Sequence, residues 1–116
     1  MILTSRLESD VTIIAVEADR INAASAVHLK DQFRDCISNS NGRVLMDVEQ
    51  VTFMDSSGLG AMIAALKLLS GRKLELANLS EAVRTVFSLT RMDTVFVLHQ
   101  DIQSALKLQN KDVRVA

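Results

Sequence analysis

The sequence of 116 residues contains no proline, tryptophan or tyrosine, and it has one cysteine and two histidines. The single cysteine, Cys36, cannot form an internal disulfide, so we expect a reducing, cytoplasmic location. So few cysteines and histidines also argue against a metal site. The 13 Lys and Arg nearly balance the 14 Asp and Glu, which excludes the strongly basic surface of a nucleic-acid-binding protein.

Long apolar runs are missing as well. The longest uncharged apolar stretch, residues 59–66, is far shorter than the roughly 18 residues that span a bilayer, so we expect no membrane insertion. The first ten residues, MILTSRLESD, do not have the basic start and long apolar core of a signal peptide. With 48% hydrophobic residues, the chain is long enough for one packed core, and we expect one domain over residues 1–116.

Apolar periodicity predicts strands and helices that alternate along most of the chain. Two β-favourable runs, 2–8 and 11–17, are separated by the turn residues Ser9 and Asp10, which predicts a hairpin. Further strands are expected at 43–48, 73–76 and 95–98, and helices at about 22–38, 57–69, 81–89 and 102–106. In the strand at 73–76, charged and apolar residues alternate, which predicts one wetter face.

The resulting order, β-β-α-β-α-β-α-β-α, predicts an α/β fold. Strands that alternate with helices are typical of right-handed crossovers and parallel pairing. We therefore expect a mixed, mostly parallel sheet with an N-terminal antiparallel hairpin and about four helices.

The segment most informative about function is TFMDSSGLG, residues 52–60, between a buried strand and an apolar helix. Asp55 or Ser56 is expected to cap that helix, and Asn22 or Ser25 the helix before it. A helix N-terminus carries partial positive charge and outward-pointing amides, so it tolerates an added phosphate. A phosphate on a hydroxyl here would add about −1.5 to −2 charges and would block a docking partner without refolding the protein.

Local pattern alone favours simpler roles. Ser56 is most simply part of a helix cap, Asp55 holds the turn, and Ser57 forms local hydrogen bonds. Gly58 and Gly60 weaken a first helical turn, so a reason for them is expected. Either close packing on the sheet or the approach of a partner's backbone supplies one.

Catalytic and nucleotide motifs are incomplete. Ile63 stands where the third glycine of GxGxxG would be, and no GxxxxGK[ST] run exists. An enzyme that used Ser56 as a nucleophile would need a base, and His28 and His99 lie in no recognisable catalytic motif. We therefore expect neither an enzyme nor a cofactor, and a nucleotide-binding or hydrolytic protein is the weakest of the alternatives.

The run FMDSSGLG, between its strand and its helix, resembles the signature of the STAS domain family, and most of all the single-domain bacterial anti-sigma factor antagonists. The resemblance covers nearly the whole chain and implies the STAS fold. It also implies that Ser56, directly after the aspartate, is phosphorylated by a partner kinase. The partner-binding residues that the resemblance implies are Asn22, Ala23, Asp55, Ser57, Gly58 and Leu59. Many phosphorylated relatives have an aspartate where this chain has Asn22, so we expect kinase specificity or phosphate lifetime to differ.

Taken further, the resemblance implies a partner-switching regulator. Unphosphorylated, the protein would bind an anti-sigma factor or switch serine kinase, and phosphorylation of Ser56 would release that partner. A metal-dependent serine phosphatase of the PP2C type would oppose the kinase, and Mg-ATP would belong to the kinase. The alternative is a constitutive STAS subunit of a transport complex, which would use the same surface without phosphorylation.

Overall fold

Five strands form one twisted sheet in the computed structural model, which describes residues 2–115. The strands are β1 (Leu3–Glu8), β2 (Val11–Val16), β4 (Arg43–Asp47), β6 (Leu74–Ala77) and β7 (Val97–His99), in the spatial order β1-β2-β4-β6-β7. β1 and β2 pair antiparallel, and the other neighbours pair parallel. Ser9 and Asp10 have φ values of 52° and 64°, as a two-residue hairpin turn requires. The predicted mixed sheet with an N-terminal hairpin is confirmed.

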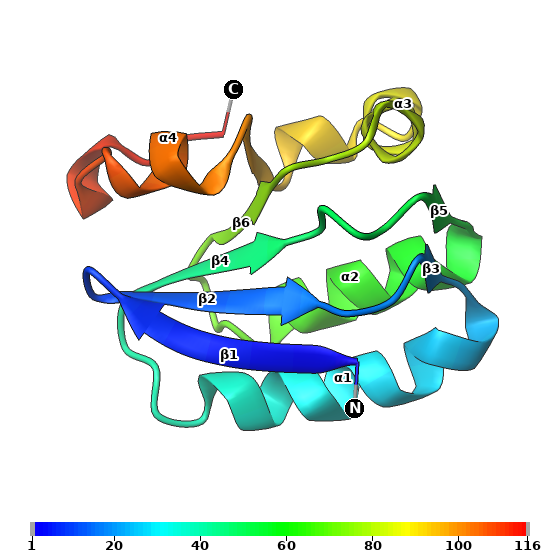
Figure 1. Cartoon of the computed structure of the whole chain (residues 1–116), viewed down its shortest axis with the longest axis horizontal. Coiled ribbons are helices and arrows are strands. Elements are labelled where there is room, and N and C mark those ends of the chain that lie inside the picture. The colour runs from blue at the N-terminus through cyan, green and yellow to red at the C-terminus, as the bar shows by residue number, and fades with distance from the viewer. Residues whose placement is uncertain (1, 116) are drawn as a thin grey trace.

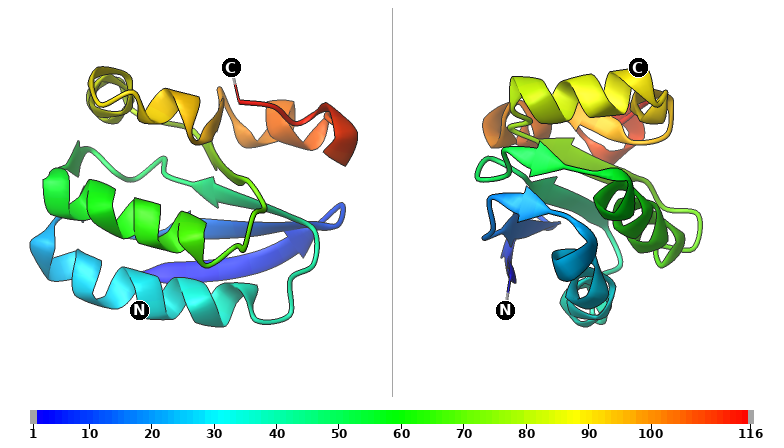
Figure 2. Two further views of the ribbon diagram at one scale, coloured as in Figure 1. Left: turned by 180° about the vertical axis from the view of Figure 1, so that it is seen from behind. Right: turned by 90° about the vertical axis from the view of Figure 1, so that its right-hand side faces the viewer.

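Helices cover the sheet on both sides (Figures 1 and 2). They are α1 (Ala23–Ile37), α2 (Ser56–Lys67), α3 (Glu81–Leu89) and α4 (Ile102–Leu106). α1 and α2 lie together against one face, and α4 lies against the other. α3 lies on the side of the molecule away from α1, where it contacts β5 (Phe53–Met54) and the turn Met92–Thr94, and its Val83 and Phe87 belong to the larger core cluster.

The core is divided between the two faces because successive strand residues point to opposite sides. The larger cluster joins α1 and α2 to the strands and includes Ile14, Val16, Leu29, Phe33, Val44, Met46, Met62, Ala65, Leu74 and Leu76. The smaller cluster lies beneath α4 and consists of Val11, Ile13, Leu45, Ala77 and Ala105. Cys36 is half-buried and packs against the larger cluster.

Sequence periodicity missed several short elements. Two strands of two residues each, β3 (Arg20–Ile21) and β5 (Phe53–Met54), pair in parallel outside the main sheet. Two 3-10 turns, Met92–Thr94 and Asn110–Asp112, were also missed, and β7 begins at Val97, later than predicted. Elements this short are below the length at which alternation can be recognised.

The predicted wetter face of β6 is wrong. All four residues of β6 are buried, and Glu75 is only 1% exposed. The charge is accommodated because Arg43 and His99 contact the Glu75 carboxylate inside the protein. Within residues 2–115, no helix is long and apolar enough to cross a membrane.

Candidate functional site

The pairing of β3 with β5 brings the starts of α1 and α2 side by side, at one end of the molecule in both views (Figures 1 and 2). Its register sets Ile21 opposite Met54, so Asn22 and Asp55 follow at matching positions. The Asp55 amide donates to the Ile21 carbonyl at 3.3 Å and continues the pairing. The Asn22 loop and the start of α2, which were predicted together as partner contacts, therefore lie side by side.

Both helix starts are capped by side chains. Asn22 Oδ1 accepts hydrogen bonds from the amides of Ala24 and Ser25, at 3.1 and 3.2 Å, and Ser25 Oγ accepts in return from the Asn22 amide at 2.9 Å. Asp55 Oδ1 accepts from the Gly58 amide at 2.8 Å. Asp55, and not Ser56, is therefore the cap of α2, and the capping role expected for Asp55 is confirmed.

Ser56 and Ser57 are the first two residues of α2, and both are exposed. Neither hydroxyl makes a hydrogen bond to any residue within 2–115. The local hydrogen bond predicted for Ser57 is therefore absent, because Asp55 already accepts from the nearby Gly58 amide and leaves the hydroxyls outside the cap. A modifying protein has direct access to both oxygens.

Gly58 and Gly60 have different surroundings. Gly58 is buried, and a Cβ at that position would lie 1.9 Å from the Ile21 carbonyl oxygen. Close packing of α2 against β3 therefore explains Gly58. Gly60 is exposed, and a Cβ there would have nothing within 4 Å, so packing gives no reason for it. Leu59, between them, is half-buried at the margin of the larger core cluster.

Sequence reasoning missed Arg20 and Phe53, which also lie at this end of the molecule. Arg20 Cζ lies 5.0 Å from the centroid of the Phe53 ring, and 41% of Phe53 is exposed. This contact depends on the pairing of two very short strands, so the sequence alone carries no signal for it. Ala23, at the start of α1, is exposed on the same surface.

Partial positive charges, a guanidinium and a carboxylate meet at this end. α1 and α2 both present their N-termini here, and neither has an acidic residue in its first turn. Their partial positive charges and the Arg20 guanidinium are opposed at the helix starts by the Asp55 carboxylate.

A second polar cluster lies away from this site, on the face that α4 covers. Arg43 contacts both carboxylate oxygens of Glu75, at 2.9 and 2.6 Å, and His99 Nε2 lies 2.8 Å from Glu75 Oε1. Arg43 also donates to the carbonyls of Ala105 and Leu108, at 2.8 Å each, and so ties the end of α4 to the sheet.

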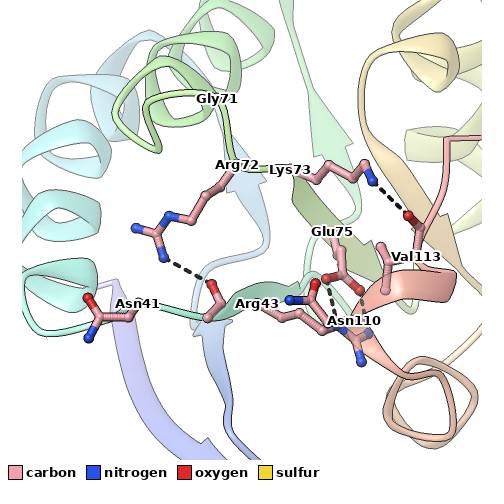
Figure 3. Close-up of a pocket in the computed structure, with 9 residues that line it drawn as sticks. Asn41, Arg43, Gly71, Arg72, Lys73, Glu75, Asn110 and Val113 are labelled. Atoms are coloured by element: carbon pink, nitrogen blue, oxygen red, sulfur yellow. Dashed lines mark hydrogen bonds and ion pairs between the residues drawn. The ribbon is translucent and has the colours of Figure 1, made fainter.

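This cluster holds Glu75 charged. Burial alone would raise the pKa of Glu75, but the hydrogen bonds and positive charge of Arg43, together with His99, outweigh burial and lower it. Within residues 2–115, no group of three or more His, Cys, Asp or Glu could hold a metal ion. The cluster acts as a structural clamp, and Figure 3 shows its Arg43 and Glu75 beside a cavity at the amino ends of β4 and β6.

Comparison with known proteins identifies the fold. A model of the STAS domain matches residues 4–105. An anti-sigma-factor antagonist (STAS) domain protein from Planctomyces limnophilus is 22% identical, with a TM-score of 0.81 over 90% of this chain and 95% of that chain. An anti-sigma factor antagonist from Mycobacterium paratuberculosis is also 22% identical, with a TM-score of 0.80 over 90% of each chain.

A more distant relative is the Bacillus cell fate determinant SpoIIAA in its phosphorylated form. It is 15% identical, with a TM-score of 0.64 over 92% of this chain and 99% of that chain. Because the domain model spans well over half of the chain and the folds agree, the protein belongs to the STAS domain family.

Proposed function

We propose that residues 1–116 form one STAS domain that acts as a phosphorylation-controlled partner-switching regulator of the anti-sigma factor antagonist type. Unphosphorylated, it binds an anti-sigma factor or switch serine kinase, and it releases that partner when Ser56 is phosphorylated. A serine phosphatase of the PP2C type reverses the modification in the cytoplasm. The observation that carries the proposal is the exposed Ser56 at the start of α2, beside the start of α1, with a hydroxyl that makes no hydrogen bond to any residue within 2–115.

The proposed docking surface consists of Asn22, Ala23, Asp55, Ser57, Gly58 and Leu59 around Ser56. Within it, Asn22, Asp55 and Gly58 hold the two helix starts in place through caps and close packing. Ala23 and Ser57 are exposed and available to a partner directly. Gly60 extends this surface, since its bare backbone lets a partner approach closely.

Charge explains the release. A partner that docks flush on this surface excludes water from Ser56, and a phosphate there would bring about −1.5 to −2 charges into the interface. A buried charge without a matching group opposes binding strongly. The helix N-termini stabilise the phosphate in the free protein, so modification changes the surface while the fold is retained.

Intact-mass measurement on protein from growing cells, before and after phosphatase treatment, tests the modification. We expect a fraction heavier by one phosphate, and loss of that fraction in Ser56→Ala. The same preparations identify the kinase or anti-sigma factor that co-purifies with the unphosphorylated protein. A phosphate that persists in Ser56→Ala would contradict the assignment to Ser56.

Binding of the co-purified partner, measured by calorimetry, tests the switch. We expect Ser56→Ala to bind like the wild type and Ser56→Asp to bind at least about tenfold more weakly, equivalent to about 1.4 kcal/mol. Ser104→Asp is the matched control, because it adds the same charge in the first turn of α4, outside the docking surface, and should leave binding unchanged. Equal binding by Ser56→Ala and Ser56→Asp, with no phosphate in cells, would favour a constitutive STAS subunit instead.

A further inference from the structure

The loop between α1 and β4, residues 38–42, contains Asn41 followed directly by Gly42. The chain has five asparagines, and Asn41 is the one that precedes a glycine. Asn41 is exposed, and its carboxamide makes no hydrogen bond to any residue within 2–115. Its side chain is therefore free to turn toward the backbone that follows it.

The residues on both sides of Asn41 are held in place, but its reactive neighbour is not bonded. Arg72 Nη1 donates to the Gly42 carbonyl at 2.9 Å and lies 3.4 Å from Ser40 Oγ. Thr12 Oγ1 lies 3.2 Å from the same Ser40 Oγ. The Gly42 amide, in contrast, donates to no residue within 2–115. The carboxamide of Asn41 and the nitrogen that follows it are thus both without a partner in that range.

Glycine has no Cβ to shield its own nitrogen, so that nitrogen can attack a carboxamide directly before it. We propose that Asn41 is a site of self-modification of this kind. The Gly42 nitrogen forms a bond to Asn41 Cγ, the Cγ–Nδ2 bond breaks, and Nδ2 leaves as ammonia with the proton of the Gly42 amide. Water then opens the cyclic imide. Cleavage at Cγ gives aspartate, and cleavage at the main-chain carbonyl carbon gives isoaspartate.

The other asparagines lack one or both of these conditions. Asn22 Oδ1 accepts hydrogen bonds from two backbone amides, and Asn78 Nδ2 donates to Asp47 Oδ1 at 3.1 Å. Asn39 and Asn110 are exposed, but each precedes a residue with a side chain. Because Asn39 lies in the same loop as the proposed site, it serves as an internal control.

Isoaspartate would lengthen the main chain by one methylene group between Ser40 and Gly42, the two residues that Arg72 contacts. We expect these contacts to weaken and the loop to become less stable. The site is remote from Ser56, because α1 begins beside the start of α2, ends at this loop and is about 22 Å long. The modification is therefore independent of the proposed function, and the two proposals can fail separately.

Mass spectrometry of the purified protein, incubated at neutral pH and physiological temperature, measures the conversion. The tryptic peptide of residues 35–43 contains both Asn39 and Asn41, and its fragmentation tells them apart. We expect Asn41 to convert at least about tenfold faster than Asn39, because the residue after Asn41 has no Cβ. Conversion should slow at mildly acidic pH, since the attacking amide must lose its proton. Equal rates at the two asparagines, or no conversion of Asn41, would overturn the proposal.

Variants and the unfolded chain are the controls. Asn41→Gln retains a carboxamide but must close a larger ring, so conversion at residue 41 should slow at least about tenfold. Asn39→Gln and Ser56→Ala should leave the rate at Asn41 within about twofold. The native protein should convert less than about tenfold more slowly than protein unfolded in urea, because the fold leaves both reacting groups unbonded within residues 2–115. A greater suppression would show that the fold protects Asn41, and would overturn the proposal.

The effect on stability is tested separately for the added charge and for the longer main chain. Asn41→Asp carries the charge alone, whereas the isoaspartate form, purified from aged protein, carries both. Methylation by an isoaspartate-specific methyltransferase measures the isoaspartate content of each sample. We expect the urea midpoint of Asn41→Asp to lie close to that of the wild type, and the isoaspartate form to unfold at a lower urea concentration. Equal midpoints for the isoaspartate form and Asn41→Asp would overturn the inferred weakening of the Arg72 contacts.

Discussion

The polar groups at the start of α2 and those in the cluster beneath α4 differ in exposure and in hydrogen bonding. At the start of α2, the hydroxyls of Ser56 and Ser57 are exposed and unbonded within residues 2–115. Beneath α4, Arg43 and Glu75 are buried, and hydrogen bonds occupy both oxygens of the carboxylate. A chemical change at Ser56 therefore alters the surface and leaves the fold, whereas a change at Glu75 alters the fold itself. In the proposed function, the first kind of position would serve as the switch, and the second kind would keep the docking surface rigid.

The largest effect on stability is expected for Glu75→Gln. The substitution keeps the shape of the side chain but leaves the Arg43 guanidinium buried without its counter-charge. Removal of one partner from a buried pair lowers the free energy of unfolding by about 3–5 kcal/mol. Urea unfolding near neutral pH measures this loss, and a loss below about 1 kcal/mol would contradict the structural role of the cluster.

The pH dependence of the stability loss in Glu75→Gln tests whether that loss comes from the charge of Glu75. The folded-state pKa of Glu75 lies below its unfolded value of about 4.3, so its stabilising contribution is present above that value and is lost as pH falls through the folded pKa. The difference in free energy of unfolding between wild type and Glu75→Gln should therefore shrink as the solution is acidified below about pH 4. A difference that stays constant would show that the charge of Glu75 is not what stabilises the fold.

The cluster also shows what the sequence could not predict. The order of the strands of the main sheet and of the α-helices follows from periodicity, and the structure confirms it. The alternation at Glu75 suggested a wet face, yet its counter-charges come from Arg43 and His99, 32 and 24 residues away in the chain. Pairing at that distance follows from strand order and register, which no local pattern contains.

The start of α2 was more predictable, but not completely. A carboxylate directly before two serines and an apolar helix predicts a cap, and Asp55 is that cap. The reason for Gly58 remained open because it depends on the Ile21 carbonyl, which only the β3 and β5 pairing brings close. Arg20 and Phe53 were missed for the same reason.

Substitution of Gly58 or Gly60 in α2 is expected to change the free energy of unfolding by an intermediate amount, in opposite directions. Gly58→Ala places a methyl group 1.9 Å from the Ile21 carbonyl oxygen, which forces β3 and α2 apart and should lower the free energy of unfolding by about 1–3 kcal/mol. Gly60→Ala is the matched control, because it meets nothing within 4 Å and should raise stability by about 0.5–1 kcal/mol. Chemical denaturation measures both. Equal effects would mean that the close approach of α2 to β3 is not required for folding.

The smallest effects on stability are expected at Asp55, which caps α2, and at Ser56, which carries the exposed hydroxyl. Comparing the two separates capping from the role of the hydroxyl. Asp55→Ala removes the acceptor for the Gly58 amide and should lower the free energy of unfolding by about 1 kcal/mol. Ser56→Ala removes a hydroxyl that bonds to no residue within 2–115, and should change stability by less than about 0.5 kcal/mol. Thermal unfolding of the two variants in one buffer gives the comparison. If Ser56→Ala were the more destabilising of the two, the hydroxyl would be part of the cap. That result would contradict the claim that Ser56 can accept a phosphate without disturbing α2.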